Sequence, residues 1–219
     1  MAYPTVSAPY GLKPINLIGG QVFAGSTRQL TIASAYGTSI FYGDAVKIVS
    51  GGTIEKDTGT TTATPCGVFM GCSYVNAQGQ VIFAQYFPAS TTAPTGTVIT
   101  AYVSDDPDQL FKAVLVAGTT ADDTTSGLLP AYLGRTMIGS NAQIVQNAGS
   151  TASGDSKIAI YSAAGGTTTA TLPIRIVDVV PDTANSSGNF CEFIVKWNAP
   201  NVTGQTVAGG HQYLNPTGV

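Results

Sequence analysis

The side chains that could carry acid–base or nucleophilic chemistry are few in this chain of 219 residues. His211 is its only histidine, so a Ser-His-Asp or Cys-His arrangement would have to be built on it. It follows Gly209 and Gly210 near the C-terminus, a flexible flank that would position a general base poorly. We therefore interpret His211, together with Tyr213, as an interface or structural residue, and we expect no catalytic residue.

The carboxylates and glycines give no clearer sign of a reaction. Most of the twelve acidic residues lie in turn settings, Glu55 and Glu192 lie in strand-like patterns, and nothing in the spacing pairs two carboxylates as glycosidases do. A glycosidase stays open at this point, but we predict that the protein is not an enzyme. Paired glycines such as Gly51 and Gly52 indicate turns at strand ends, so we expect no nucleotide-binding loop and no cofactor.

The acidic cluster and the cysteines offer no metal site. Residues 105–108 read Asp-Asp-Pro-Asp, which is typical of a turn and lacks the ligand spacing of a calcium-binding loop. The cysteines are Cys66, Cys72 and Cys191, without a Cys-x-x-Cys pair or a Cys/His cluster. We expect no bound metal and three buried free thiols, with a bridge between Cys66 and Cys72 as the alternative.

The sparse charge is the most informative property of the whole chain. Only 10% of its residues are Asp, Glu, Lys or Arg, against about a quarter in ordinary soluble domains. A surface this poor in charge suits a protein that is covered by copies of itself or by partners. The net charge is -3 and the nine Lys and Arg are scattered, which disfavours direct nucleic-acid binding. No apolar run is long enough to span a membrane, and the N-terminus lacks the pattern of a signal peptide.

Residues 1–20 are predicted to form an extended N-terminal arm. Its three prolines each remove a backbone donor and bias the preceding residue toward extended geometry. Apolar anchors lie between them, so we expect the arm to dock on another surface and to be dispensable for the fold. The predicted contact residues of the arm are Tyr3, Pro4, Pro9, Tyr10, Leu12 and Pro14.

Residues 21–219 are predicted to form one all-β domain, with residues 88–96 as the one place where a division is expected. Short β-branched and apolar runs are separated by turn residues, and hairpins are expected around residues 50–52 and 76–79. The polar residues 143–156 indicate a long loop. The expected strands are residues 28–33, 39–42, 45–49, 53–56, 67–74, 80–87, 98–104, 157–162, 170–180 and 190–197, and a further strand pattern follows residue 108. Together they predict an antiparallel β-sandwich or a β-barrel-like domain.

Five segments occur in an order that is similar to that of one protein family. They are residues 10–16 (Tyr-Gly-Leu-Lys-Pro-Ile-Asn), 41–47 (Phe-Tyr-Gly-Asp-Ala-Val-Lys), 171–185 with a Leu-Pro-Ile-Arg-Ile-Val strand and a Pro-Asp turn, 191–198 (Cys-Glu-Phe-Ile-Val-Lys-Trp-Asn), and His211-Gln212-Tyr213. The chain thereby resembles the head decoration proteins of tailed bacteriophages, especially those of marine phages. Residues 199–210 are a long insert relative to that family's pattern.

The resemblance implies a capsid decoration protein, also called a cement protein, with a β-tulip-type domain. Such proteins sit as homotrimers on the outer surface of the icosahedral phage head, bind neighbouring major capsid subunits and perform no chemistry. We accordingly expect the major capsid protein and copies of the chain itself as partners. We expect the virion as the location, after synthesis in the bacterial cytoplasm. Two other classes stay open: another virion protein (major capsid or tail tube), and a carbohydrate-binding tail-fibre or spike module.

Overall fold

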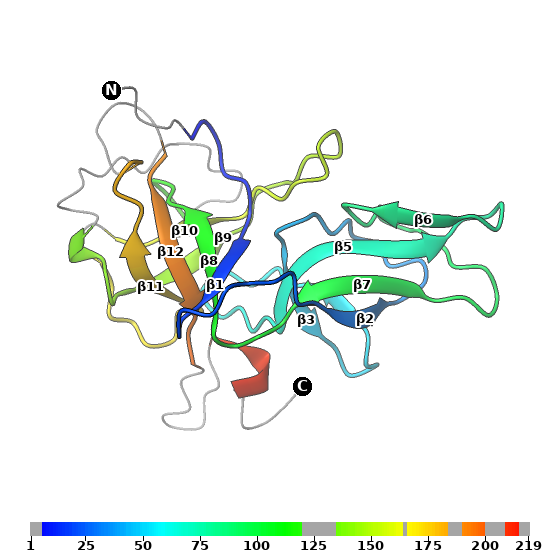
Figure 1. The fold of residues 1–219 in the computed structure, drawn as a ribbon, viewed down its shortest axis with the longest axis horizontal. Helices are drawn as coiled ribbons and strands as arrows, with labels where there is room; N and C mark the ends of the chain where they lie inside the picture. The colour runs from blue at the N-terminus through cyan, green and yellow to red at the C-terminus, as the bar shows by residue number, and fades with distance from the viewer. Residues whose placement is uncertain (1–5, 120–134, 164–165, 184–189, 200–208, 215–219) are drawn as a thin grey trace.

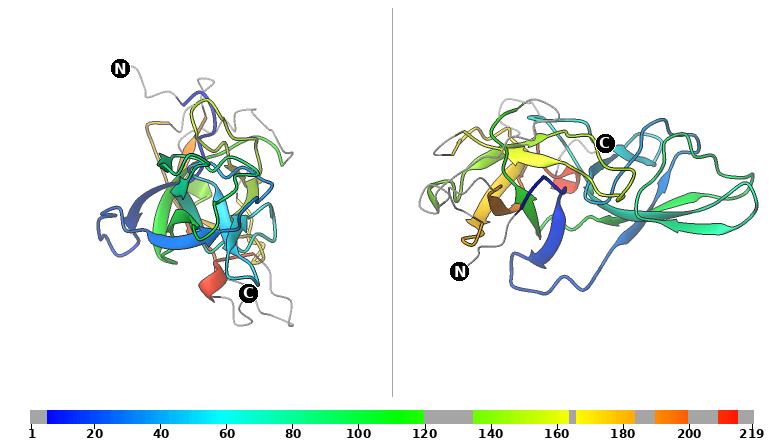
Figure 2. Two further views of the ribbon diagram at one scale, coloured as in Figure 1. Left: turned by 90° about the vertical axis from the view of Figure 1, so that its right-hand side faces the viewer. Right: turned by 90° about the horizontal axis from the view of Figure 1, so that it is seen from above.

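Twelve short strands and the 3₁₀ helix η2 (Gln212–Leu214) are the main elements of the computed structural model of the chain (Figure 1). The structure describes residues 6–119, 135–163, 166–183, 190–199 and 209–214. The strands form two six-stranded sheets that follow one another along the long axis of the molecule (Figures 1 and 2). We call the sheet of residues 28–104 the first unit, and the sheet of residues 13–17 and 109–197 the second unit. Among the described residues no helix is long and apolar enough to cross a membrane.

The first unit is a small closed ring of strands with one strand outside it. The strand order is β3-β4-β2-β7-β5-β6, and β3 also pairs with β5, which closes a five-stranded ring and leaves β6 outside. All pairings are antiparallel except the one between β2 and β4. The bounds are β2 (Arg28–Ile32), β3 (Ala45–Ile48), β4 (Ile54–Lys56), β5 (Gly67–Val75), β6 (Val81–Ala84) and β7 (Ile99–Ser104).

The second unit is an antiparallel sheet whose last strand curls back. The strand order is β1-β8-β12-β11-β9-β10. Beyond the end of β8, Leu115 forms a parallel bridge with Ile160 of β10, and the Val116 N–H donates to the Ile160 carbonyl (3.0 Å). The bounds are β1 (Lys13–Leu17), β8 (Gln109–Val114), β9 (Asn141–Val145), β10 (Ala159–Tyr161), β11 (Ile174–Val179) and β12 (Glu192–Trp197).

Turn chemistry explains both expected hairpins. β3 pairs with β4, and β5 pairs with β6, across the predicted turns. In the second turn the Gly79 N–H donates to the Asn76 carbonyl (3.0 Å), and the Asn76 N–H donates to the Gln80 carbonyl (2.9 Å). Gly79 has a φ of 78°, the left-handed conformation that a three-residue hairpin loop with a bulge requires. Both predicted hairpins are confirmed.

Each unit has its own core, and the core of the second unit reaches into the first. The first core is built around Phe69 and Phe87. The second surrounds Phe111 and Trp197, whose ring centroids lie 5.3 Å apart. Val68, on a strand of the first unit, is fully buried within this second core. The two units are therefore packed against each other through apolar side chains.

A buried carboxylate reinforces the junction between the units. Asp44 is fully buried, and it accepts hydrogen bonds from the Phe41 N–H (2.9 Å) and from the Ser156 hydroxyl of the second unit (2.6 Å). The ammonium group of Lys56 pairs with the same carboxylate at 3.0 Å. A Cβ on Gly11 would lie 2.7 Å from the Cβ of Ser156, so the chain segments approach more closely here than any side chain allows.

The expected all-β fold of sandwich or barrel-like type is confirmed. Residues 39–42 were expected to be a strand but form only isolated bridges, at Ile40 and Tyr42. β9 begins before the predicted loop 143–156 and extends into it, because its polar side chains find backbone partners, as Asn141 does with the Thr169 carbonyl (2.9 Å). Residues 88–96 connect β6 to β7 inside the first unit, whereas the chain passes between the units through residues 18–27 and 105–108.

Residues 6–17 are part of the second unit and not a free arm, which corrects the expectation from the sequence. β1 pairs with β8, with Pro14 opposite Phe111. Leu12 is fully buried in the second core, and the Val6 carbonyl accepts a hydrogen bond from the Phe190 N–H (3.1 Å). The prolines suggested an arm, but an edge strand tolerates proline because its outer side needs no backbone donor.

We predict that Leu12→Ala lowers the free energy of unfolding by about 2–5 kcal/mol, because it leaves a cavity in a closed core. The matched control is Ile18→Ala, whose side chain is 50% exposed and whose loss should cost about 0.5 kcal/mol or less. Urea denaturation of both variants measures the difference. Equal, small effects would mean that residues 6–17 do not pack on the second unit in solution.

Candidate functional site

The predicted contact residues of the N-terminus face their own chain. Leu12 lies in the second core and Pro9 is buried, while Pro14 is half-buried in β1. Tyr3 and Pro4 lie outside the described residues. Pro9, Leu12 and Pro14 therefore offer little side-chain surface to a partner.

Tyr10 is held by charged groups of β8 and β12. Its hydroxyl donates to Glu192 Oε1, and Lys112 Nζ pairs with the same oxygen at 3.0 Å. Lys13 Nζ lies 4.6 Å from the centroid of the Tyr10 ring, within the range of a cation–π contact. Burial raises the pKa of Tyr10, and the hydrogen bond to Glu192 and its charge raise it further. The phenol therefore stays protonated and fastens the N-terminal segment to the second unit.

Residues 209–214, which we call the C-terminal clasp, join the two units. The side-chain amide of Gln212 accepts from the Ile48 N–H (2.8 Å) and donates to the Ile48 carbonyl (2.8 Å). The Gln212 N–H donates to the Pro65 carbonyl (2.8 Å), also in the first unit. The preceding His211 N–H donates to the carbonyl of Asn198, directly after β12 in the second unit (3.0 Å). Consecutive residues of the clasp thus bind one unit each.

His211 is fully buried within the clasp. Its Nδ1 accepts the Tyr213 N–H (3.2 Å), which assigns the proton of the neutral ring to Nε2. Nε2 has no acceptor in hydrogen-bonding geometry, although backbone groups of Cys66 and Asp105 lie close enough to favour its protonation. Burial outweighs them and lowers the pKa of His211 to about 4. At neutral pH the side chain is an uncharged internal contact.

Tyr213 is the most exposed of the predicted contact residues that the structure describes, at 41%. Its hydroxyl donates to Asp105 Oδ2 (2.9 Å), and Arg28 Nε pairs with the same oxygen at 2.6 Å. The Arg28 guanidinium also lies over the Tyr213 ring, 4.9 Å from its centroid. Burial raises the pKa of Asp105, and the charge of Arg28 opposes that shift. Tyr213 thus belongs to a polar cluster where the chain passes between the units.

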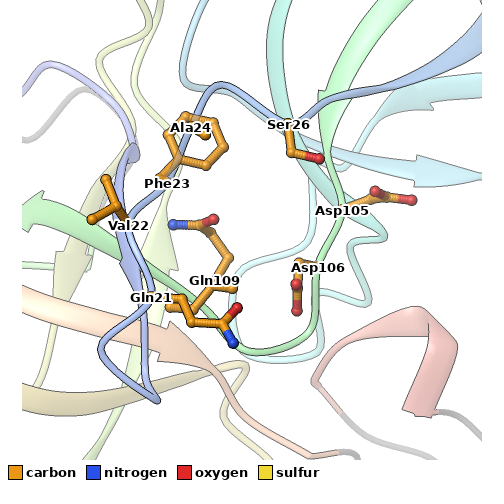
Figure 3. Close-up of a pocket in the computed structure, with 9 residues that line it drawn as sticks. Gln21, Val22, Phe23, Ala24, Ser26, Asp105, Asp106 and Gln109 are labelled. Atoms are coloured by element: carbon orange, nitrogen blue, oxygen red, sulfur yellow. The ribbon is translucent and has the colours of Figure 1, made fainter.

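A cavity of about 290 Å³ lies beside this cluster, between residues 17–26 and the turn at residues 105–109 (Figure 3). Its polar groups already hold the local backbone. Asp106 Oδ1 accepts the Asp108 N–H (2.8 Å), and Gln109 Nε2 donates to the carbonyls of Asn16 (3.0 Å) and Leu110 (2.8 Å). These bonds confirm the predicted Asp-Pro turn, and the cavity separates the two connections between the units.

The cysteines are buried and free, as expected from the sequence. Burial raises the pKa of Cys66, Cys72 and Cys191 to about 12 each, so the thiols stay protonated and unreactive at neutral pH. In the part of the chain that the structure describes, no three His, Cys, Asp or Glu side chains gather where they could hold a metal ion.

Three large apolar side chains are exposed in a part of the chain that carries no charge. Residues 58–104 contain no Asp, Glu, Lys, Arg or His, and they form β5, β6 and β7, which project from the far end of the first unit (Figure 1). We call the side of this sheet that bears Ser73, Phe83 and Thr100 the outer face; these three residues lie in one row of the register. Phe83 is 75% exposed and Val81 62%, and Val98, directly before β7, is 63% exposed.

The outer face is the candidate functional site. Residues 81–87 are apolar on both faces of their strand, a sequence pattern that indicates an interface on the side away from the core, but the predicted contact residues were placed elsewhere. The sequence interpretation considered the low charge as an average over the chain, whereas the signal is the uninterrupted absence of charge over residues 58–104. Interfaces between proteins are depleted of charged residues at their centre, so this arrangement suits a binding surface.

No protein-family model, no curated protein and no solved structure matches the chain. The contacts and surfaces described above are therefore what supports a function.

We predict that burial of neutral His211 makes folding sensitive to acid. The unfolded side chain takes up a proton near pH 6.5 and the folded one near pH 4, so its contribution is complete above pH 6.5 and is lost as the pH falls toward 4. The loss amounts to about 3 kcal/mol for a shift of this size. The measurement is the difference in unfolding free energy between wild type and His211→Asn from pH 7.5 to 4.

The asparagine variant keeps an acceptor for the Tyr213 N–H and removes the titrating group. Asp57 and Asp105, whose pKa values burial raises, act in the opposite direction but are present in both proteins and cancel in the difference. The nearby carboxylates of Asp106 and Asp108 work against the lowered pKa of His211. A difference that stays constant with pH would show that His211 is not buried in solution.

Proposed function

We propose that the chain is a structural protein of a virion, a capsid decoration protein that binds the outer surface of an icosahedral phage head and stabilises contacts between major capsid subunits. The single observation that carries this proposal is the charge-free outer face of β5, β6 and β7 with its exposed Val81 and Phe83, and with the exposed Val98 directly before β7. A protein that stays free in solution gains nothing from such a face, whereas a protein bound over a large area buries it.

The chemistry of the described residues suits binding better than catalysis. The one histidine is buried in the clasp, the thiols are protonated, and the carboxylates Asp44, Asp105 and Glu192 each pair with a cation of the same chain. These groups stabilise the fold. We therefore propose a protein without enzymatic activity, in agreement with the resemblance to phage head decoration proteins.

The resemblance supplies the partner and the place in the particle. The major capsid protein is the proposed partner, copies of the chain form a homotrimer, and the virion surface is the proposed location. Because residues 6–17 are committed to the second unit, we assign the contact with the capsid to the outer face and not to Tyr10, Leu12 or Pro14.

We predict that the purified chain sediments with heads of the phage that encodes it when those heads lack this protein. Val98→Lys, directly before β7 and away from the β6 edge, should abolish co-sedimentation, because a charge would be buried without a partner. Val22→Lys, 78% exposed and outside residues 58–104, is the matched control and should bind like wild type. Light scattering of the free chain should give the mass of three copies.

Wild-type chain that stays in the supernatant at every head concentration would overturn the proposal. Binding to a glycan array without binding to heads would move the function to a tail-fibre or spike module. A virion in which this chain makes up most of the head protein would identify it as the major capsid protein.

A further inference from the structure

β6 is an unprotected sheet edge. It pairs with β5 on one side, and no hydrogen bond of the described residues reaches the main chain of Val81 or Phe83 on the other. Proteins usually blunt such edges with a charged side chain, a proline or a bulge. The edge strand β1 of the second unit carries Lys13 and Pro14, whereas β6 reads Val-Ile-Phe-Ala.

The hairpin turn determines which backbone groups of β6 point outward. Asn76 and Gln80 form a hydrogen-bonded pair, and bonded and non-bonded pairs alternate along an antiparallel ladder. Ile82, opposite Tyr74, therefore bonds to β5, as does Ala84 opposite Cys72. The N–H and C=O groups of the residues between them, at positions 81 and 83, point to the free edge.

We propose that β6 pairs with β6 of a second copy of this chain, antiparallel and around a twofold axis at Ile82. In this register Val81 lies opposite Phe83 of the other copy, and the outward N–H and C=O groups of both residues form four hydrogen bonds between the chains. The two exposed apolar side chains cover each other on the outer face. The edge is thus complementary to itself, as a twofold contact requires.

The charge distribution favours a second copy as the occupant. Two copies bring together only uncharged strands, because residues 58–104 lack acidic and basic side chains altogether. Like charges opposite each other destabilise strand pairs, and none are present at this edge. A charged partner would find no side chain of opposite charge at this edge.

The contact between two β6 edges is small, so it forms only under certain conditions. A stable dimer buries about 1,200–2,000 Å² in total, and a four-residue edge with its neighbours provides less. The pairing is therefore weak in dilute solution and forms where copies are held close together. It uses the main-chain edge of β6, whereas the proposed head contact uses the side chains of the outer face, and on a head it would link neighbouring assemblies.

The test is disulfide trapping at high protein concentration under mild oxidation, with variants that each carry one added cysteine. In the proposed register Ile82 lies on the twofold axis, opposite Ile82 of the other copy, and the two form a non-hydrogen-bonded pair. The Cα atoms of such a pair are about 4.5 Å apart, within the range of a disulfide. Most of the Ile82→Cys chain should become a linked dimer. Val81→Cys and Phe83→Cys should stay monomeric, because each is offset from its own copy in this register. The native cysteines are buried and do not interfere.

A second substitution tests the pairing without relying on the new cysteine. Phe83→Lys added to Ile82→Cys should abolish the linked dimer, since it brings a charge into the paired edge, whereas Val22→Lys added to Ile82→Cys should leave it unchanged. Stronger linkage at position 81 or 83 than at 82 would overturn the register. No linkage above that of Val22→Cys would overturn the pairing itself. Neither result depends on whether the chain binds heads.

Discussion

The buried carboxylate of Asp44 is the interaction on which the arrangement of the two units depends. It receives hydrogen bonds from Phe41 and Ser156 and an ion pair from Lys56, so it joins the loop before β3, strand β4 and the segment before β10. Removal of one partner of such a buried pair leaves a charge without compensation, at a cost of about 3–5 kcal/mol. Gly11 passes directly beside Ser156, where a side chain at position 11 would collide with it. The hydrogen bond from Ser156 to Asp44 therefore depends on this close backbone approach.

Around this point the units are held together by two further kinds of contact. Val68 enters the core of the second unit, and the clasp places His211 against Asn198 and Gln212 against Ile48. Asp44, Lys56 and the polar residues of the clasp lie at this junction, whereas the far end of the first unit, within residues 58–104, carries no charged side chain. The exposed Val81 and Phe83 of β6 lie at this uncharged end.

Much of the fold can be predicted from local pattern, and little of the site. The Gly51-Gly52 and Asn76–Gly79 turns determine their hairpins through short-range chemistry, so alternation and turn residues were sufficient. β1 was missed because the burial of Leu12 depends on strands that lie about a hundred residues later in the chain. His211 was interpreted as an interface or structural residue, and its burial depends on contacts with Asn198 and Tyr213 that the sequence does not reveal. The apolar residues on both faces of residues 81–87 indicate an interface, but which of these side chains are exposed is a property of the folded chain.

The pairing of β1 with β8 also determines the order in which the chain can fold during synthesis. Lys13 pairs with Lys112, and all strands of the first unit lie between them. A ribosome that adds about 5–20 residues per second makes the partner of β1 roughly 5–20 s after β1 itself. The first unit can close during that interval, since β2 to β7 pair only with each other. The N-terminal segment, with its apolar Leu12, must wait unpaired until the second unit is made.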